Sequence, residues 1–84
     1  MIRKILDVKA NDDFTLECEM ENGEIYKYDM SFVHKESGEV IEPLRNIELF
    51  KQVWVDYGAL EWPNGYGIHG NTVAREGELI KKSA

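Results

Sequence analysis

The sequence predicts an α+β domain: an antiparallel meander sheet, made of three N-terminal strands plus a second hairpin, with one short helix packed on it. Apolar and polar residues alternate along residues 15–20, which is typical of a half-buried antiparallel strand. Glycine-containing turns at 22–23 and 57–58 each separate two extended segments, as a hairpin requires. Residues 1–76 are interpreted as one domain, and residues 77–84 as a loosely held C-terminal tail.

The first strand is expected over residues 2–10 and ends at a polar turn formed by residues 11–13. Leu6, Val8 and Ala10 fall on one side of its alternation. Side chains at every second position of a strand point to the same face. We therefore expect these three side chains to face the core.

The turn at Asn22 and Gly23 sets the register of the N-terminal hairpin. A two-residue turn would place Leu16 beside Asp29 and mix core with charge, whereas a three-residue loop with a left-handed Gly23 shifts the pairing by one. The longer loop predicts three pairs: Leu16 with Tyr28, Cys18 with Tyr26, and Glu17 with Lys27. Such aromatic and opposite-charge pairs stabilise a hairpin by roughly 0.2–1 kcal/mol each. We therefore predict the three-residue loop.

The second half of the chain predicts the short helix and the second hairpin. Asn46 is a good N-cap for a helix over residues 47–53, in which apolar residues share one face. Residues 54–56 and 59–62 flank the turn at 57–58 and read as paired strands.

The connecting segments carry weaker patterns. Residues 31–38 are predicted to form a loop or one irregular turn, and residues 40–41 a brief extended segment. Asn71 is a candidate cap for a single helical turn that Gly77 stops.

Charge is unevenly distributed along the chain. The protein has 16 acidic and 10 basic residues and a formal net charge of −6, and residues 1–42 contain 11 of the acids but 5 of the bases. A negative surface repels nucleic-acid phosphates and anionic lipids and attracts basic proteins. We therefore expect neither direct nucleic-acid binding nor membrane binding. The single cysteine, Cys18, cannot form an intramolecular disulfide, which favours the reducing cytoplasm.

No complete set of catalytic, metal-binding or cofactor-binding residues is found. Cys18, His34 and His69 lack the spacing of a zinc site, so no metal is expected. Residues 65–70 match G-x-G-x-x-G, but the 14 residues after them are too few for the crossover helix and second strand of a dinucleotide site. The sequence therefore predicts no cofactor, no catalytic residues and no enzyme.

Four short motifs occur together in this chain: Glu-Asn-Gly-Glu at 21–24, Pro-Leu-Arg at 43–45, Glu-Leu-Phe at 48–50 and Trp-Pro-Asn-Gly at 62–65. In this order they resemble the small bacterial domain-of-unknown-function family 2442, over about residues 2–74. The resemblance implies an α+β domain with a meander sheet and a short helix. Because genes of this family often lie beside genes for other small proteins, it also suggests a paired system such as toxin and antitoxin.

These observations predict a small acidic protein–protein interaction module. Its expected partner is another small protein, possibly basic, or a second copy of the chain. The candidate contacts are acidic residues of the second strand and aromatic and polar residues near the second hairpin: Glu17, Glu19, Trp54, Tyr57, Trp62, Asn64 and Tyr66. The sequence leaves open whether the aromatic residues belong to the core or to an interface.

The alternative hypothesis is a small-molecule site or minor enzyme. It would be formed by polar and aromatic residues from several segments: Asp29, His34, Trp62, Asn64 and His69. A structural role is also predicted for Asp29, because a carboxylate at the end of a strand accepts backbone hydrogen bonds from the turn that follows. Asn22 and Gly23 are likewise assigned to a structural turn.

Overall fold

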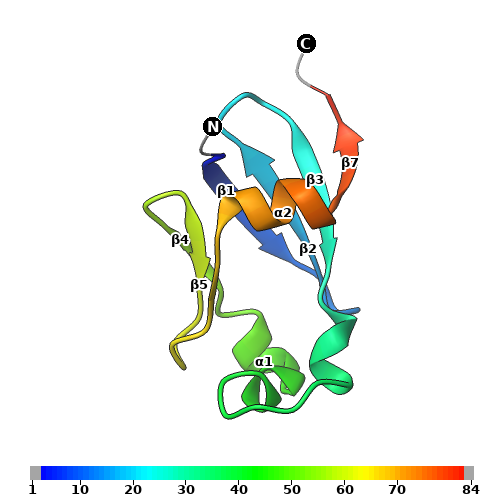
Figure 1. The fold of residues 1–84 in the computed structure, drawn as a ribbon, viewed down its shortest axis with the longest axis vertical. Helices are drawn as coiled ribbons and strands as arrows, with labels where there is room; N and C mark the ends of the chain where they lie inside the picture. Colours follow the sequence, from blue (N-terminus) through cyan, green and yellow to red (C-terminus); the bar gives the residue numbers. More distant parts are fainter. Residues whose placement is uncertain (1–2, 83–84) are drawn as a thin grey trace.

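The structure is a computed structural model that describes residues 3–82. Its fold consists of two antiparallel sheets and four short helices (Figure 1). The strands are β1 (Ile5–Ala10), β2 (Thr15–Met20), β3 (Ile25–Asp29), β4 (Trp54–Asp56), β5 (Ala59–Glu61), β6 (Gly67–Ile68) and β7 (Glu78–Lys81). The helices are two 3₁₀ helices, Ser31–His34 and Glu42–Arg45, followed by α1 (Ile47–Phe50) and α2 (Gly70–Glu76). Residues 1–2 and 83–84, which belong to the predicted first strand and tail, lie outside the described residues.

The strand order confirms the α+β meander. One sheet has the order β1-β2-β3-β7 and the other has the order β4-β5-β6. Helix α2 crosses one face of the larger sheet, and the β4–β5 hairpin lies on the β1 side, opposite β7 (Figure 1). Among residues 3–82, none of the helices has the length and apolar character needed to cross a membrane.

The N-terminal hairpin has the predicted register. Leu16 pairs with Tyr28, Cys18 with Tyr26, and Glu17 with Lys27. Gly23 adopts a φ of 87°, and its N–H donates to the carbonyl oxygen of Met20 at 2.9 Å. Asn22 and Asp29 have the predicted turn roles, because each side-chain oxygen accepts a backbone N–H two residues further along, at 3.0 and 2.9 Å.

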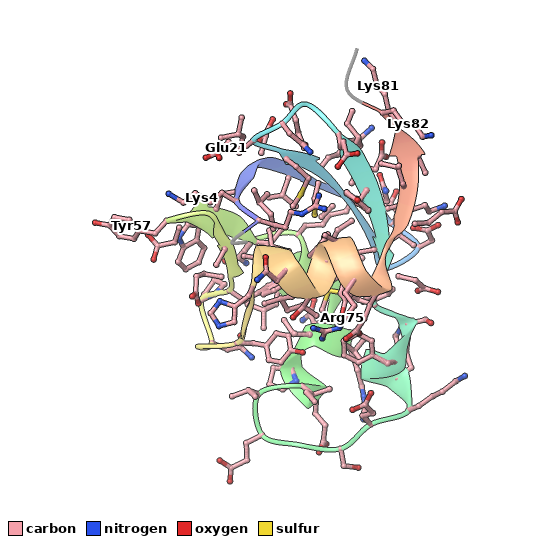
Figure 2. All side chains as sticks on the ribbon, turned by 45° about the horizontal axis from the view of Figure 1, so that its top comes forward. Lys4, Glu21, Tyr57, Arg75, Lys81 and Lys82 are labelled. Carbon is pink, nitrogen blue, oxygen red and sulfur yellow. The ribbon has the colours of Figure 1, made fainter. Side chains whose placement is uncertain are left out.

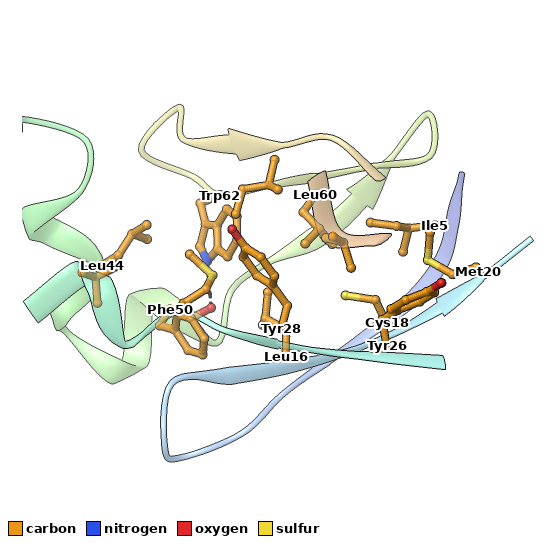
Figure 3. Packing of buried hydrophobic residues seen from close by; sticks show 14 residues of the cluster. Ile5, Leu16, Cys18, Met20, Tyr26, Tyr28, Leu44, Phe50, Leu60 and Trp62 are labelled. Atoms are coloured by element: carbon orange, nitrogen blue, oxygen red, sulfur yellow. Dashed lines mark hydrogen bonds between the residues drawn. The ribbon is translucent and has the colours of Figure 1, made fainter. Parts of the chain in front are cut away.

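The core lies between the larger sheet and the elements that cover it (Figure 3). Its fully buried side chains come from both sheets, from the helices and from the loops between them: Ile5, Leu16, Cys18, Met20, Met30, Val33, Leu44, Phe50, Leu60, Trp62 and Val73. Burying such a side chain stabilises a fold by about 1.5–3 kcal/mol. These side chains hold the domain together, whereas five other large apolar residues are exposed: Leu6, Val40, Trp54, Tyr57 and Ile80.

The first strand corrects one prediction. The pairing of β1 with β2 skips a residue between Ile5 and Asp7, so Leu6 is a bulge residue. Leu6 is 58% exposed, whereas Ile5 is buried. The expectation that Leu6 faces the core is wrong. Val8 and Ala10 pack against the core as predicted.

The helix after Asn46 begins as predicted but ends early. The Asn46 side-chain oxygen accepts the Glu48 N–H at 2.9 Å, which confirms the cap. The helix ends at Phe50 rather than at residue 53, because the following residues extend to form β4. The extended segment predicted at residues 40–41 is a turn instead, since Ile41 has helical dihedrals and precedes the 3₁₀ helix Glu42–Arg45, which has Pro43 in its first turn.

The C-terminal third contains two elements that the sequence pattern did not predict. Strand β6 adds to the second hairpin, with Ile68 opposite Leu60. Strand β7 pairs with β3, with Leu79 opposite Tyr26. Residues 78–81 are therefore an ordered strand and not the loosely held tail that was predicted. Leu79 supplies the physical reason, because it packs against the core. Asn71 lies inside α2 rather than capping it, and Gly77 ends that helix as predicted.

Candidate interaction surface

The turn between β4 and β5 holds Tyr57 in the left-handed conformation, which asparagine and glycine adopt more readily. Asp56 pairs with Ala59, so Tyr57 and Gly58 form a two-residue turn, and both have positive φ, 49° and 81°. Positive φ at both positions defines a type I′ turn, which favours Asn and Gly. Tyr57 is nevertheless 99% exposed and points away from the protein (Figure 2).

Phe14 is the other non-glycine residue with positive φ among residues 3–82, and it shows how such strain is normally offset. Its φ is 63°, but its ring packs edge-on against His34, with 4.5 Å between ring centroids, and at a tilt against Phe50, with 5.0 Å between ring centroids. Its carbonyl oxygen also accepts the N–H of Met30 at 2.9 Å. Within the described residues, the Tyr57 ring has neither an aromatic neighbour nor a hydrogen bond.

The Tyr57 turn lies against the start of β1, where the two sheets meet. The N–H of Ile5 donates to the carbonyl oxygen of Gly58 at 2.9 Å, and β1 packs beside β4. Two further apolar side chains are exposed at this junction: Leu6 at 58% and Trp54 at 45%. We call Leu6, Trp54 and Tyr57 the junction patch.

Leu6 was missed in the sequence, although a signal was present. Ile5 and Leu6 are adjacent apolar residues in a strand whose faces alternate, so both cannot point into the core. Trp54 could have been assigned to the surface in the same way, because the neighbouring Val55 pairs with the buried Leu60. Alternation then turns Trp54 to the outer face.

A cavity of about 190 Å³ opens beside the junction patch. Arg3, Lys4, Tyr57, His69 and Asn71 help to line it, and no acidic residue does. Two cationic side chains, Arg3 and Lys4, thus line this cavity together with His69, and the carboxylate that balances Arg3, that of Glu24, lies outside the lining. Lys4 lies on the same side of the molecule as Tyr57 in Figure 2.

Contacts made by the backbone and side chain of Arg3 hold this cavity in shape. Asn71 accepts the N–H of Arg3 at 2.6 Å, which ties α2 to the start of β1. Gly70 is needed for that approach, since a Cβ at this position would collide with the carbonyl oxygen of Arg3. The guanidinium of Arg3 also binds the Glu24 carboxylate at 3.2 Å. A hydrogen bond from Asn22, together with Arg3, lowers the pKa of Glu24.

The family model described as "Protein of unknown function (DUF2442)" matches residues 5–73. The chain belongs to the DUF2442 family. No match was found among curated proteins or among solved structures.

The motifs that resemble DUF2442 serve the fold rather than the junction patch. The Trp62 indole N–H donates to the carbonyl oxygen of Phe50 at 2.9 Å, and the Asn64 side chain donates to that of Val40 at 2.8 Å. Arg45 donates to the carbonyl oxygen of Val33 at 2.6 Å. The bonds of Trp62 and Asn64 fasten the second hairpin to the helical layer, and the bond of Arg45 joins the two 3₁₀ helices of that layer.

Three of the predicted contact residues around the second hairpin thus belong to the interior of this DUF2442 domain or to its framework. Trp62 is 1% exposed, and its ring lies 5.6 Å from that of the half-buried Tyr66. Asn64 is occupied by its bond to the backbone. Trp54 and Tyr57 remain as the exposed aromatic residues of the predicted set.

The two acidic contact residues lie on the outer face of the larger sheet. Glu17 stands between Lys9 and Lys27 in the strand register and is half-buried, so its charge has opposite charges on both sides. Glu19 is exposed and pairs with Asp7, a like charge. Uncompensated negative charge is therefore concentrated at Glu19 rather than at Glu17.

The residues of the alternative small-molecule site do not come together. Asp29 lines a groove on the sheet side, and His69 lines the cavity beside Tyr57. His34 packs on Phe14, and Trp62 is enclosed. Within residues 3–82, no three His, Cys, Asp or Glu side chains are placed to hold a metal ion.

Cys18 has the environment of a core residue. It is fully buried, and burial raises the pKa of its thiol to about 12. A nucleophilic cysteine needs a lowered pKa and access to solvent. The side chain therefore acts as a small apolar residue, as its place on the inner face of β2 indicates.

Proposed function

We propose that this DUF2442 domain is a non-enzymatic interaction module that binds another protein through the junction patch. The observation that supports the proposal most strongly is Tyr57, which is left-handed and 99% exposed. A left-handed conformation costs a non-glycine residue roughly 1–2 kcal/mol. No contact within the described chain offsets that cost, which is the condition expected of a residue whose contacts are made with another molecule.

The composition of the junction patch agrees with this role. Exposed aromatic residues that lie close together mark protein interfaces, because they bury a large area and keep a polar atom accessible. Tyr57 and Trp54 are exposed aromatic residues of one hairpin, and Leu6 is an exposed apolar residue of the neighbouring strand β1. Two cations border the junction patch through the neighbouring cavity: Lys4, and Arg3, which also binds Glu24 within the chain. A partner surface that fits combines an apolar pocket with acidic side chains.

A basic partner is expected from the net charge of the whole chain, which acts at long range, and not from the residues of the contact itself. The net charge of −6 speeds the encounter with a positively charged protein, and salt reduces this effect. Beside Tyr57 itself, the charge that the chain presents to a partner is that of Lys4, which is positive. The further proposal that the partner belongs to a paired, toxin–antitoxin-like bacterial system has the family resemblance as its support.

The test is a binding titration. Proteins retained by the chain at low salt are identified by mass spectrometry, purified, and titrated against the wild type and against Tyr57→Asn, Trp54→Ala and Val40→Ala. Val40 is the matched control, because it is 41% exposed but lies outside the junction patch.

The proposal predicts that the Kd rises at least about 30-fold for the two aromatic variants, as for interface hot spots, and changes less than about threefold for the control. Equal affinity for all four proteins would contradict it. A chain that retains no protein at low salt would also count against it.

A further inference from the structure

We propose that two copies of this chain form a symmetric dimer by antiparallel pairing of their β7 strands, with Glu78 of each copy opposite Lys81 of the other. This inference is independent of the proposed function. It concerns the opposite edge of the larger sheet from the one beside the junction patch (Figure 1).

Strand β7 is an open edge in the part of the chain that the structure describes. It is last in the order β1-β2-β3-β7, so one side of its backbone has no strand partner. Ile80, in the middle of the strand, is 45% exposed. An unpaired edge with an exposed apolar side chain is a template for pairing with another strand.

Charge is separated along this strand. Glu76 and Glu78 stand at its start, where four carboxylates and one lysine line a groove of about 520 Å³: Asp13, Asp29, Glu76, Glu78 and Lys27. Lys81 and Lys82 stand at its end, project from the body of the protein (Figure 2), and make no ion pair within residues 3–82. Antiparallel pairing of two copies brings each acidic end to a basic end.

The register of β7 permits this pairing. Glu78 lies opposite Lys27, and Lys81 lies opposite Ile25. The register shifts between Leu79 and Lys81, so that Ile80 is the bulge residue. Lys27 and Ile25 are two residues apart on β3 and share a face, so Glu78 and Lys81 also share a face. In a regular strand, positions three apart would point to opposite faces.

The resulting contact closes on itself. The charges of residues 78–81 are self-complementary when antiparallel, because Glu78 of each copy meets Lys81 of the other and the apolar Leu79 and Ile80 lie between these two pairs. A two-fold axis through the pair makes each contact twice. Lys82 of the second copy then continues toward Glu76 and the acidic groove.

The competing interpretation is that the shortness, the bulge and the lysine of β7 protect the edge against pairing. Analytical ultracentrifugation over a range of concentrations distinguishes the two. Lys81→Glu places like charges opposite each other twice, so we expect the dimer Kd to rise about tenfold or more. Lys35→Glu, the same charge change at an exposed lysine outside β7, should change it by less than about threefold.

A charge swap tests the register itself. In the double variant Glu78→Lys with Lys81→Glu the opposite charges face each other again, so its dimer Kd should return toward that of the wild type. A wild type that stays monomeric at millimolar concentration overturns the proposal. A dimer that is indifferent to Lys81→Glu overturns it equally.

Cross-linking gives a second readout that does not depend on variants. In an equal mixture of ¹⁴N- and ¹⁵N-labelled chains, a zero-length carbodiimide should join Glu78 of one isotope to Lys81 of the other. Intermolecular links at other positions alone would refute the β7 interface. The Tyr57→Asn variant should dimerise like the wild type, so failure of this inference and failure of the proposed function can be told apart.

Discussion

Replacing Tyr57 by Asn should make the protein more stable while it weakens partner binding. Asn tolerates the left-handed region far better than Tyr, and Asn-Gly is a preferred type I′ dipeptide. The native φ of 49° is thereby relieved. Because Tyr57 is 99% exposed, its removal forfeits almost no burial. Of the roughly 1–2 kcal/mol that a left-handed residue costs, we expect about 1 kcal/mol to be recovered.

Thermal unfolding followed by circular dichroism measures this gain. For a domain of this size, about 1 kcal/mol corresponds to a rise in Tm of about 4–8 °C. Natural residues that lower stability without an internal benefit are typical of functional sites. A Tm that falls on substitution would refute the reasoning, because it would show that the ring stabilises the folded chain.

Phe14→Asn is the matched control. It relieves the same kind of backbone strain at a φ of 63°, but it removes a ring that packs on His34 and Phe50. Loss of that packing outweighs the relief, so we expect a net loss of roughly 1–3 kcal/mol. We therefore expect the free energy of unfolding to rise for Tyr57→Asn and to fall for Phe14→Asn. That result would show that packing offsets the backbone strain at Phe14 but not at Tyr57.

Three further substitutions or titrations test the fold around the site. Gly70→Ala drives a methyl group into the carbonyl oxygen of Arg3, so urea unfolding should show a loss of roughly 1–3 kcal/mol; an unchanged midpoint would contradict the close approach. Cys18, with a pKa near 12, should resist a disulfide reagent at pH 8 until denaturant is added, and rapid labelling of the native protein would disprove its burial. A hydrogen bond from Thr15 lowers the pKa of Asp13 below 3.8, so its stabilising effect is present above that pH and is lost as the pH falls through the folded pKa. Thr15→Val should raise the Asp13 pKa in a carboxyl NMR titration, and an unshifted curve would refute the assigned cause.

Local patterns in the sequence were sufficient for the parts of the fold that local chemistry determines. The register of the β2–β3 hairpin follows from side-chain alternation and from a glycine that can adopt positive φ, and the structure has that register. The cap at Asn46 is equally local, since donor and acceptor lie two residues apart.

The features that the sequence did not predict depend on distant segments. Leu6 is exposed because the ladder with β2 contains a bulge beside the turn at Gly58. Strand β7 forms because α2 returns the chain to β3, where Leu79 meets Tyr26. The pairing of β7 leaves no periodic pattern near its residues, and the adjacent apolar residues Ile5 and Leu6 are the one local sign of the bulge.

The sequence predicted the aromatic residues of the candidate site but did not separate the exposed ones from the buried ones, because burial depends on distant segments. Two tryptophans of the same hairpin were equal candidates, and their strand position relative to the core decides between them: Trp62 is enclosed and Trp54 is not. The strain at Tyr57 belongs to the backbone of the turn, where the structure shows a φ of 49°, and it leaves no mark on the hydrophobic pattern.

The two tryptophans also provide the most direct test of the interaction surface. In a ¹⁵N-labelled chain titrated with its purified partner, the indole N–H signal of Trp54, which is 45% exposed, should shift strongly. That of Trp62, which is bonded to Phe50 in the core, should stay in place. A titration that reaches saturation with the Trp54 signal unmoved would contradict binding at the junction patch.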